Sequence, residues 1–200
     1  MSRILALLSG LTLCMSLQAG TVLFDNTFPF PDGADVVADN IGLFDSFSTA
    51  TNSGLLSKTE FLLSGDNTSS GSLSVDLFAD TGVPSVGPMI ANLGTISDAQ
   101  LSIVPAIITL TPASQVSLAA NTRYWIGLSS TTSTAMWNWS FNVSGPGVAG
   151  EFLHNDLGTF PSSQGAYQME VEVAPEPAAL LLSGVALLTC SIALRRRASR

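Results

Sequence analysis

Three tryptophans occur in two short runs that have the composition of β-strands. In MWNWSFNV, Trp137, Trp139 and Phe141 alternate with polar residues and therefore share one face of a strand. In RYWIGL, Trp125 faces away from its apolar neighbours, so it is the tryptophan most expected to be exposed. Exposed aromatic faces pack well against the C–H faces of pyranose rings. These side chains are therefore candidates for sugar stacking, and the alternative is that they fill a hydrophobic core.

A second group of candidate residues is acidic. The run PDGADVVADN brings Asp32, Asp35 and Asp39 together with Asn40 in one short loop. Ca²⁺ binds several oxygen ligands from such loops. The spacing does not follow the calcium loop of helix–loop–helix proteins, so a solvated loop without metal is the alternative.

Residues for covalent or acid–base catalysis are sparse. His154 is the only histidine, and both cysteines, Cys14 and Cys190, lie near the ends of the chain. A G-x-S-x-G nucleophile elbow is absent from the sequence. A carboxylate pair that meets only in space would leave no sequence pattern, so a secreted carboxylate-dependent hydrolase stays a minor alternative. We expect a protein that is not an enzyme and has no cofactor.

The elements that must position these residues are strands. Between residues 20 and 173, short runs with alternating apolar residues are separated by Gly, Pro, Asn, Asp and Ser. Roughly eight to eleven such strands in about 155 residues are typical of a sandwich or barrel. The prediction is one all-β domain, an antiparallel β-sandwich of jelly-roll type. Pro105 in LSIVPAIITL predicts an edge or bulged strand.

The net charge of the body argues against nucleic acid and anionic membranes as partners. Lys58 and Arg123 are the only basic residues between 20 and 173, against fourteen acids, so this body carries a net charge of about −12. Nucleic acid and anionic membrane surfaces require clustered Lys and Arg, and neither is expected to bind the body. The acidic surface favours solubility outside the cell.

Both ends of the chain are apolar. Arg3, an apolar stretch over 4–17 and the small residues Ala19 and Gly20 predict a signal peptide over 1–19. Residues 178–194 carry no charge and would span about 25 Å as a helix, slightly less than the hydrocarbon core of a bilayer. They predict a transmembrane helix, for which a buried core helix is the alternative. The basic residues that follow, within 195–200, indicate a cytoplasmic tail by the positive-inside rule.

The tripeptide Pro175-Glu176-Pro177 lies just before that helix. Its two prolines keep the chain extended, which suits recognition by a processing enzyme. The order of Pro-Glu-Pro, apolar span and Arg195-Arg196-Arg197 resembles the PEP-CTERM sorting signal, here over 174–200, a segment also labelled ice-binding protein C-terminal domain. The resemblance implies an exosortase as partner, anchoring in the inner membrane before processing, and a surface or extracellular destination in a bacterium that makes exopolysaccharide.

The body resembles a second group of proteins. TVLFDN, SLSVDLFADTGVPSVG and LAANTRYWIGL look like segments of the choice-of-anchor surface domains, and that resemblance implies no activity. The expected function is therefore a non-catalytic surface or matrix protein associated with polysaccharide. The main alternative is a carbohydrate-binding module that uses exposed aromatics, with or without Ca²⁺. Ice binding would need a flat threonine-rich face, and the run SSTTSTA at 129–135 is too short for one.

Overall fold

The computed structural model describes residues 20–28, 30–37, 42–66 and 70–174. They contain fourteen strands and two 3-10 helices. The strands are β1 (Thr21–Asp25), β2 (Gly33–Val36), β3 (Leu43–Ser48), β4 (Gly54–Ser64), β5 (Ser72–Asp80), β6 (Val86–Ser97), β7 (Ala106–Leu110), β8 (Ser117–Leu118), β9 (Arg123–Ser129), β10 (Met136–Ser140), β11 (Phe152–Asn155), β12 (Gly158–Pro161), β13 (Ala166–Tyr167) and β14 (Met169–Ala174). The 3-10 helices are η1 (Asp98–Gln100) and η2 (Ser162–Gln164).

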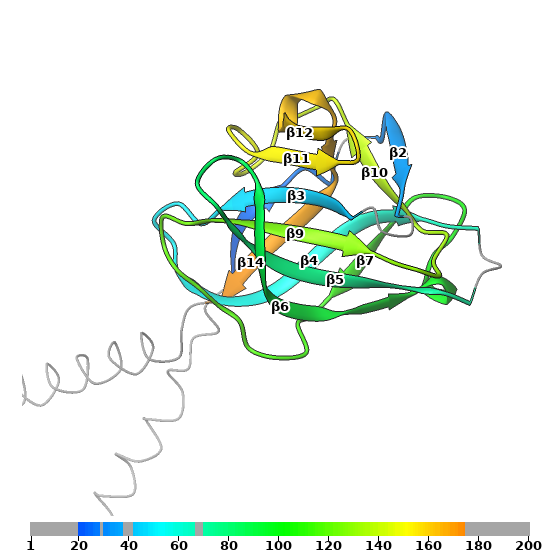
Figure 1. The fold of residues 1–200 in the computed structure, drawn as a ribbon, viewed down its shortest axis with the longest axis horizontal. Helices are drawn as coiled ribbons and strands as arrows, with labels where there is room; N and C mark the ends of the chain where they lie inside the picture. Colours follow the sequence, from blue (N-terminus) through cyan, green and yellow to red (C-terminus); the bar gives the residue numbers. More distant parts are fainter. Residues whose placement is uncertain (1–19, 29, 38–41, 67–69, 175–200) are drawn as a thin grey trace, which may run out of the picture.

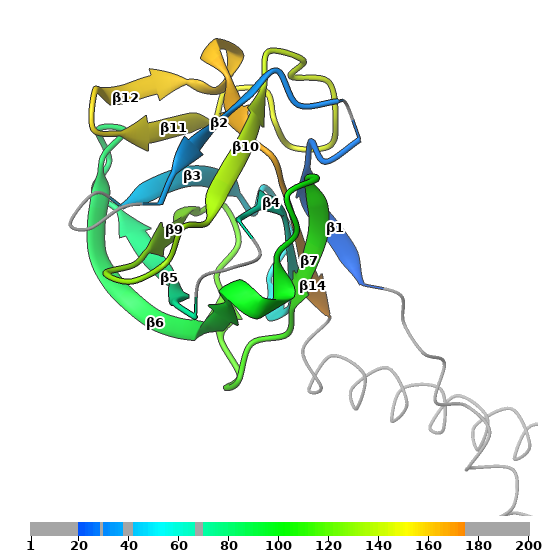
Figure 2. The same cartoon turned by 90° about the vertical axis from the view of Figure 1, so that its right-hand side faces the viewer.

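The strands form two antiparallel sheets that face each other (Figures 1 and 2). We call the first the β4 sheet; its order is β1-β14-β4-β10-β13, with β2 beside β10 and with β7 and β8 beside β4. The second, the β9 sheet, has the order β12-β11-β3-β9-β5-β6. This arrangement confirms the predicted all-β class and its antiparallel pairing.

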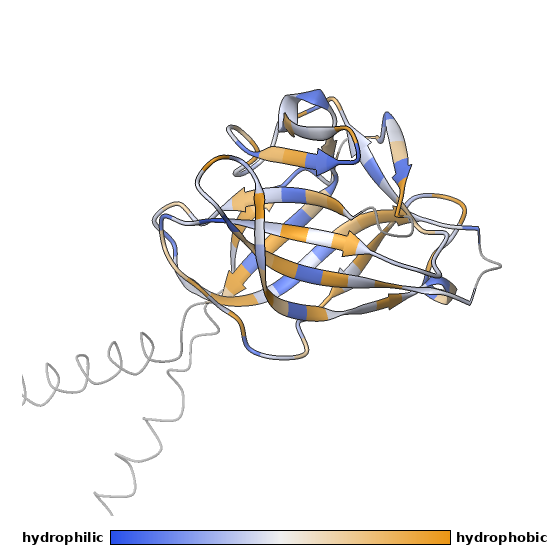
Figure 3. Ribbon diagram, viewed as in Figure 1, coloured by the Kyte–Doolittle hydropathy of each residue, from blue (hydrophilic) through white to orange (hydrophobic). Residues whose placement is uncertain are grey.

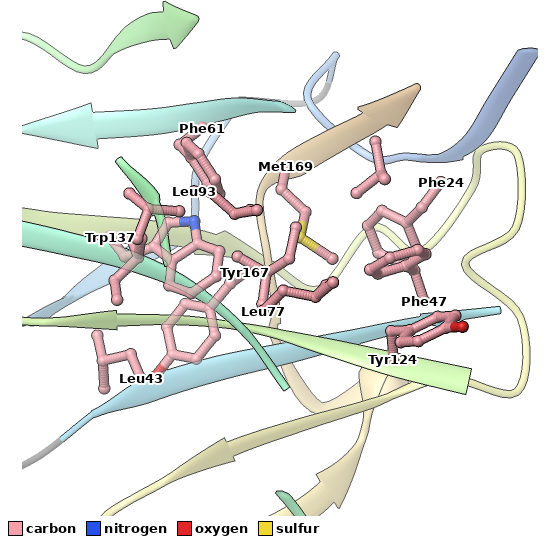
Figure 4. Close-up of a cluster of buried hydrophobic side chains, with 14 of the residues drawn as sticks. Phe24, Leu43, Phe47, Phe61, Leu77, Leu93, Tyr124, Trp137, Tyr167 and Met169 are labelled. Carbon is pink, nitrogen blue, oxygen red and sulfur yellow. The ribbon is translucent and has the colours of Figure 1, made fainter. Parts of the chain in front are cut away.

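The core lies between the sheets because each strand turns alternate side chains inward. In β5, Leu73, Val75 and Leu77 are fully buried, while their neighbours turn outward. The alternating colours along the strands in Figure 3 show the same pattern of apolar and polar residues. From the β4 sheet, Trp137 stacks on Tyr167 at 4.7 Å between ring centroids (Figure 4). Aromatic side chains from both sheets therefore supply much of the buried apolar area.

Several strands were not predicted from the sequence. β2, β11 and β12 have four residues each, in stretches rich in Gly, Asn, Asp and Pro that resemble loops. Neighbouring strands supply the pairing that such short segments cannot secure by propensity alone. The prediction for Pro105 agrees with the structure: β7 begins one residue later and pairs, within the described part of the chain, with β4 alone.

The predicted signal peptide (1–19), transmembrane helix (178–194) and basic tail (195–200) lie outside the described residues. Across the ranges that are described, no helix combines the length and apolar character needed to cross a bilayer. The last strand, β14, includes Ala174, one residue past the predicted domain end.

Candidate functional site

A surface hollow of about 410 Å³ lies on the outer face of the β9 sheet. Its lining consists of hydroxyl-bearing side chains: Ser72, Ser74, Thr95, Ser129, Ser130, Thr131 and Thr132. The sheet register brings three of them together, since Ser74 is opposite Thr95 on one side and Ser129 on the other. The alternation that buries Leu73 and Val75 turns Ser74 outward. The hollow therefore follows directly from the strand pattern.

A hydrogen-bonded group adjoins the hollow. Asn92 Nδ2 donates to Ser74 Oγ at 2.8 Å and to Asp76 Oδ1 at 2.7 Å. Ser74 Oγ in turn donates to Asp76 Oδ2 at 2.9 Å, although Asp76 itself is nearly buried. This group holds the Ser74 hydroxyl in one orientation at the wall of the hollow.

The loop that closes the other side of the hollow is also held in place. The buried carboxylate of Asp98 accepts hydrogen bonds from Ser133 Oγ and from the backbone N–H of Thr134. Ser130 Oγ donates to the carbonyl of Ser72 at 2.7 Å. The hollow thus has an open, hydroxyl-rich lining without a charged side chain.

Trp125 also lies on the outer face of the β9 sheet, but it is fully buried. Its Nε1 donates to Asp80 Oδ1 at 3.0 Å. Figure 1 shows the first half of β6 crossing in front of β3 and β9, and the bulges between β5 and β6 allow this bend. The expectation that Trp125 would be the exposed tryptophan is therefore wrong, because the β5–β6 hairpin covers the face to which it points.

Gly127 makes the packing beneath that hairpin possible. A Cβ atom at this position would lie 2.5 Å from the Phe44 ring and 2.8 Å from the Phe78 ring. We predict that Gly127→Ala lowers the free energy of unfolding by about 1–3 kcal/mol, because the two rings must move apart. Urea unfolding of the exported protein measures this. Ser129→Ala, two residues further along the same face of β9, is the control, and equal midpoints for the two variants would contradict the prediction.

The other two tryptophans have different environments. Trp137 is fully buried in the core, where its Nε1 donates to the carbonyl of Gln168 at 3.1 Å. Trp139 is only half-buried, and its ring meets Phe141 edge-on at 5.0 Å between centroids. Phe141 is 61% exposed. Of the predicted stacking residues, Trp139 alone retains access to solvent, beside Phe141.

Two further exposed aromatics were missed in the sequence. Phe28 and Phe30 are 99% and 94% exposed in the loop between β1 and β2. That loop continues into Asp32, whose backbone N–H donates to the carbonyl of Trp139 at 2.9 Å. The loop therefore leads directly to the Trp139–Phe141 pair. The signal in the sequence was TFPFPDG, in which prolines flank phenylalanines that no strand alternation can bury.

The predicted acidic residues Asp32 and Asp35 accept hydrogen bonds from different donors. Asp32 Oδ2 accepts hydrogen bonds from Ser140 Oγ and the backbone N–H of Phe141, both at 2.8 Å. Asp35 accepts one from the hydroxyl of Tyr167 at 2.6 Å, and Asp39 lies outside the described residues. Among the residues that are described, no three His, Cys, Asp or Glu side chains form a group able to hold a metal ion.

His154 and the buried Glu151 are both engaged in contacts within the domain. His154 Nδ1 lies 2.7 Å from Thr159 Oγ1, and burial lowers the pKa of the imidazole. Glu151 is buried, pairs with Arg123 Nε at 2.9 Å and accepts a hydrogen bond from Ser46 Oγ at 2.6 Å. Glu151 therefore links β3 and β9 to the loop that precedes β11.

The two ends of the domain lie side by side. Thr21 in β1 is opposite Val173 in β14, so both terminal strands meet the rest of the chain at one end of the domain (Figures 1 and 2). Val173 is buried, and Ala174 is the last residue of its strand. The predicted sorting residues Pro175, Glu176 and Pro177, and the cluster Arg195-Arg196-Arg197, lie beyond the described residues.

Comparison with protein families finds the PEP-CTERM protein-sorting motif at residues 173–197. The match contains Pro175-Glu176-Pro177 and the arginine cluster, and it confirms the resemblance seen in the sequence. The motif indicates export, membrane-anchored sorting by an exosortase system and delivery to the cell surface. No curated protein matches the chain.

Proposed function

We propose that this chain, which carries a PEP-CTERM protein-sorting motif, is a non-catalytic surface or matrix protein that associates with exopolysaccharide through a jelly-roll-like domain. The observation that carries the proposal is the sorting motif directly joined to the last strand of a folded domain. The resemblance to PEP-CTERM proteins implies a bacterium that makes exopolysaccharide, and a protein sorted to the surface of such a cell would be in contact with that polymer.

The hollow on the β9 sheet supports a neutral polysaccharide as the ligand. Hydroxyl side chains can both donate to and accept from the hydroxyls of a hexose. The body carries a net charge of about −12, so an anionic polysaccharide would be repelled at long range. Asp76 and Asp98, the buried carboxylates beside the hollow, are already engaged by neighbouring side chains, which favours binding over hydrolysis.

The second candidate is a carbohydrate-binding module that works through exposed aromatics. The Trp139–Phe141 pair, with Phe28 and Phe30 in the adjoining loop, favours it. Calcium receives no such support, because Asp32 and Asp35 are directed to different hydrogen-bond donors. The SSTTSTA run contributes Ser129, Ser130, Thr131 and Thr132 to a hollow, and this shape does not suit the flat face needed for ice binding.

Co-sedimentation with neutral polysaccharide tests the two candidates against each other. We expect Thr95→Trp, which fills the hollow, to weaken binding about tenfold, whereas Phe141→Ala leaves it unchanged. Ser117→Trp, at an exposed position of β8, is the control for an added indole. The reverse result assigns binding to the aromatics. Failure of the unaltered protein to sediment with neutral polysaccharide would overturn both candidates.

A further inference from the structure

The sorting motif begins inside the folded domain. Its first two residues, Val173 and Ala174, are the last two of β14. Val173 is opposite Thr21 on one side and Leu56 on the other, so β14 is an inner strand of the β4 sheet. Freeing its end would break backbone pairing with both β1 and β4. The motif therefore has no spacer between the sheet and Pro175.

This geometry limits how far an enzyme can stay from the domain. Three extended residues span about 10 Å, so an enzyme that holds Pro175-Glu176-Pro177 must approach the end of β14 to about that distance. Gly54 borders this point: a Cβ there would lie 2.4 Å from the carbonyl oxygen of Ala174. The residues around Gly54 therefore lie within reach of an enzyme that holds the tripeptide.

Two segments form that surface, which we call the exit rim: residues 49–54, which lead into β4, and residues 117–122, which begin with β8. They are tied together, since Thr49 Oγ1 donates to the carbonyl of Ala119 at 2.7 Å and the N–H of Asn121 donates to the carbonyl of Ala50 at 2.5 Å. Ala50 and Asn121 are the only non-glycine residues in the described part of the chain with positive φ. The hydrogen bonds between the two segments hold these left-handed conformations in place.

The chemistry of the exit rim points to a protein surface and not to lipid. The rim residues carry no charged side chain, and those exposed are Ala50, Thr51, Asn52, Ser53, Ser117, Ala119 and Asn121. Peripheral binding to a bilayer requires basic residues or large apolar side chains that insert, and these residues supply neither. Small neutral side chains permit close approach of another protein without desolvating a charge.

We propose that the exit rim docks on the exosortase-type processing enzyme while Pro175-Glu176-Pro177 occupies that enzyme's recognition site. The enzyme then recognises a folded end as well as a tripeptide. This inference depends on the sorting motif and is independent of any polysaccharide bound at the hollow.

Pulse-chase of the full-length chain in its host tests the docking. We expect Thr51→Glu/Asn52→Glu to slow conversion of precursor to mature protein about tenfold, equivalent to about 1.4 kcal/mol of lost docking free energy. The matched control is Ala99→Glu/Ala106→Glu, which adds two acids at exposed positions at the opposite end of the domain, outside the hollow. An unaltered rate in the rim variant would overturn the proposal.

A spacer separates docking from folding. Inserting about six Gly and Ser residues after Ala174 adds about 20 Å of reach, so an enzyme that holds the tripeptide no longer has to touch the rim. Because docking is then lost in every chain, the spacer should slow processing of the unaltered chain about tenfold, and the rim substitutions should cause no further slowing in the spacer chain. If the rim substitutions slow the spacer chain tenfold as well, the defect belongs to folding or export, and docking is rejected. Normal processing of the unaltered chain with the spacer would reject it too. A photo-crosslinking residue at Asn52 should capture the enzyme, whereas one at Ala106 should not. Capture of lipid alone at Asn52 would also reject docking. Polysaccharide binding by the processed rim variant should be unchanged.

Discussion

Replacing Pro175-Glu176-Pro177 with three alanines is expected to leave the precursor uncut and attached to the membrane. The prolines disfavour helix at and before their own positions, whereas alanine is the strongest helix former. In the variant, the apolar span can continue as a helix to the end of β14, and the extended peptide is lost. Cell fractionation with an immunoblot should show one larger species in the membrane fraction and little protein at the surface.

Single and paired replacements identify which part of the tripeptide matters. Pro175→Ala/Pro177→Ala keeps the carboxylate, and Glu176→Ala keeps the extended backbone. The control Ser199→Ala changes the tail without touching the tripeptide. If the triple-alanine chain has the same size and location as the unaltered chain, the sorting role of the tripeptide is wrong.

The second large effect is expected from Asp45→Asn, which should stabilise the domain. The alternation of β3 turns Asp45 toward the core together with Leu43 and Phe47. Its carboxyl is fully buried, and neither oxygen has a hydrogen-bond partner of good geometry among the described residues. Burial raises the pKa of Asp45 well above its ordinary value of 3.8; nearby Glu151 adds to the rise, and the amides of Ser46 and Tyr167 offset only part of it. An amide of the same shape removes the ionisable group and adds about 1–3 kcal/mol at neutral pH.

The sign of the pH dependence follows from the raised pKa. Above pH 4 the unfolded chain loses the Asp45 proton while the folded chain keeps it, so this residue makes stability fall as pH rises toward the folded pKa. Asp45→Asn should abolish that fall. Urea midpoints measured from pH 4 to pH 8 on the exported protein give the comparison. Asp76→Asn is the control, because Asp76 is also nearly buried but accepts hydrogen bonds from Ser74 and Asn92. A steeper decline in the Asp45→Asn protein than in the unaltered one would contradict the assignment.

Local alternation predicted the direction of side chains well but not their exposure. Leu73, Val75 and Leu77 are buried as the pattern of β5 requires. Trp125 does point away from its apolar neighbours, as its position in β9 requires, and is nonetheless covered by the β5–β6 hairpin. A strand pattern specifies a face, whereas burial depends on what else in the chain lies over that face.

The candidate site was less predictable than the fold. Ser74, Thr95 and Ser129 are far apart in the sequence and meet through the register of three strands. Serine and threonine in strands give no pattern that distinguishes a hollow from an ordinary solvated surface. The exposed Phe28 and Phe30 had a local signal in the TFPFPDG run, but the attachment of their loop to β10 through Asp32 depends on the pairing of β2 with β10.

The sequence by itself determined the sorting route and the all-β fold class of this protein. Pro175-Glu176-Pro177, the apolar span and the arginine cluster form one contiguous segment, and strand alternation and net charge are also readable from local order. Tertiary structure alone decided that the Asp45 carboxyl is fully buried, that hydroxyls gather into a hollow, and that the motif leaves an inner strand beside the exit rim. These properties arise where distant segments meet, and the free energy of such contacts depends on geometry that no single stretch of residues contains.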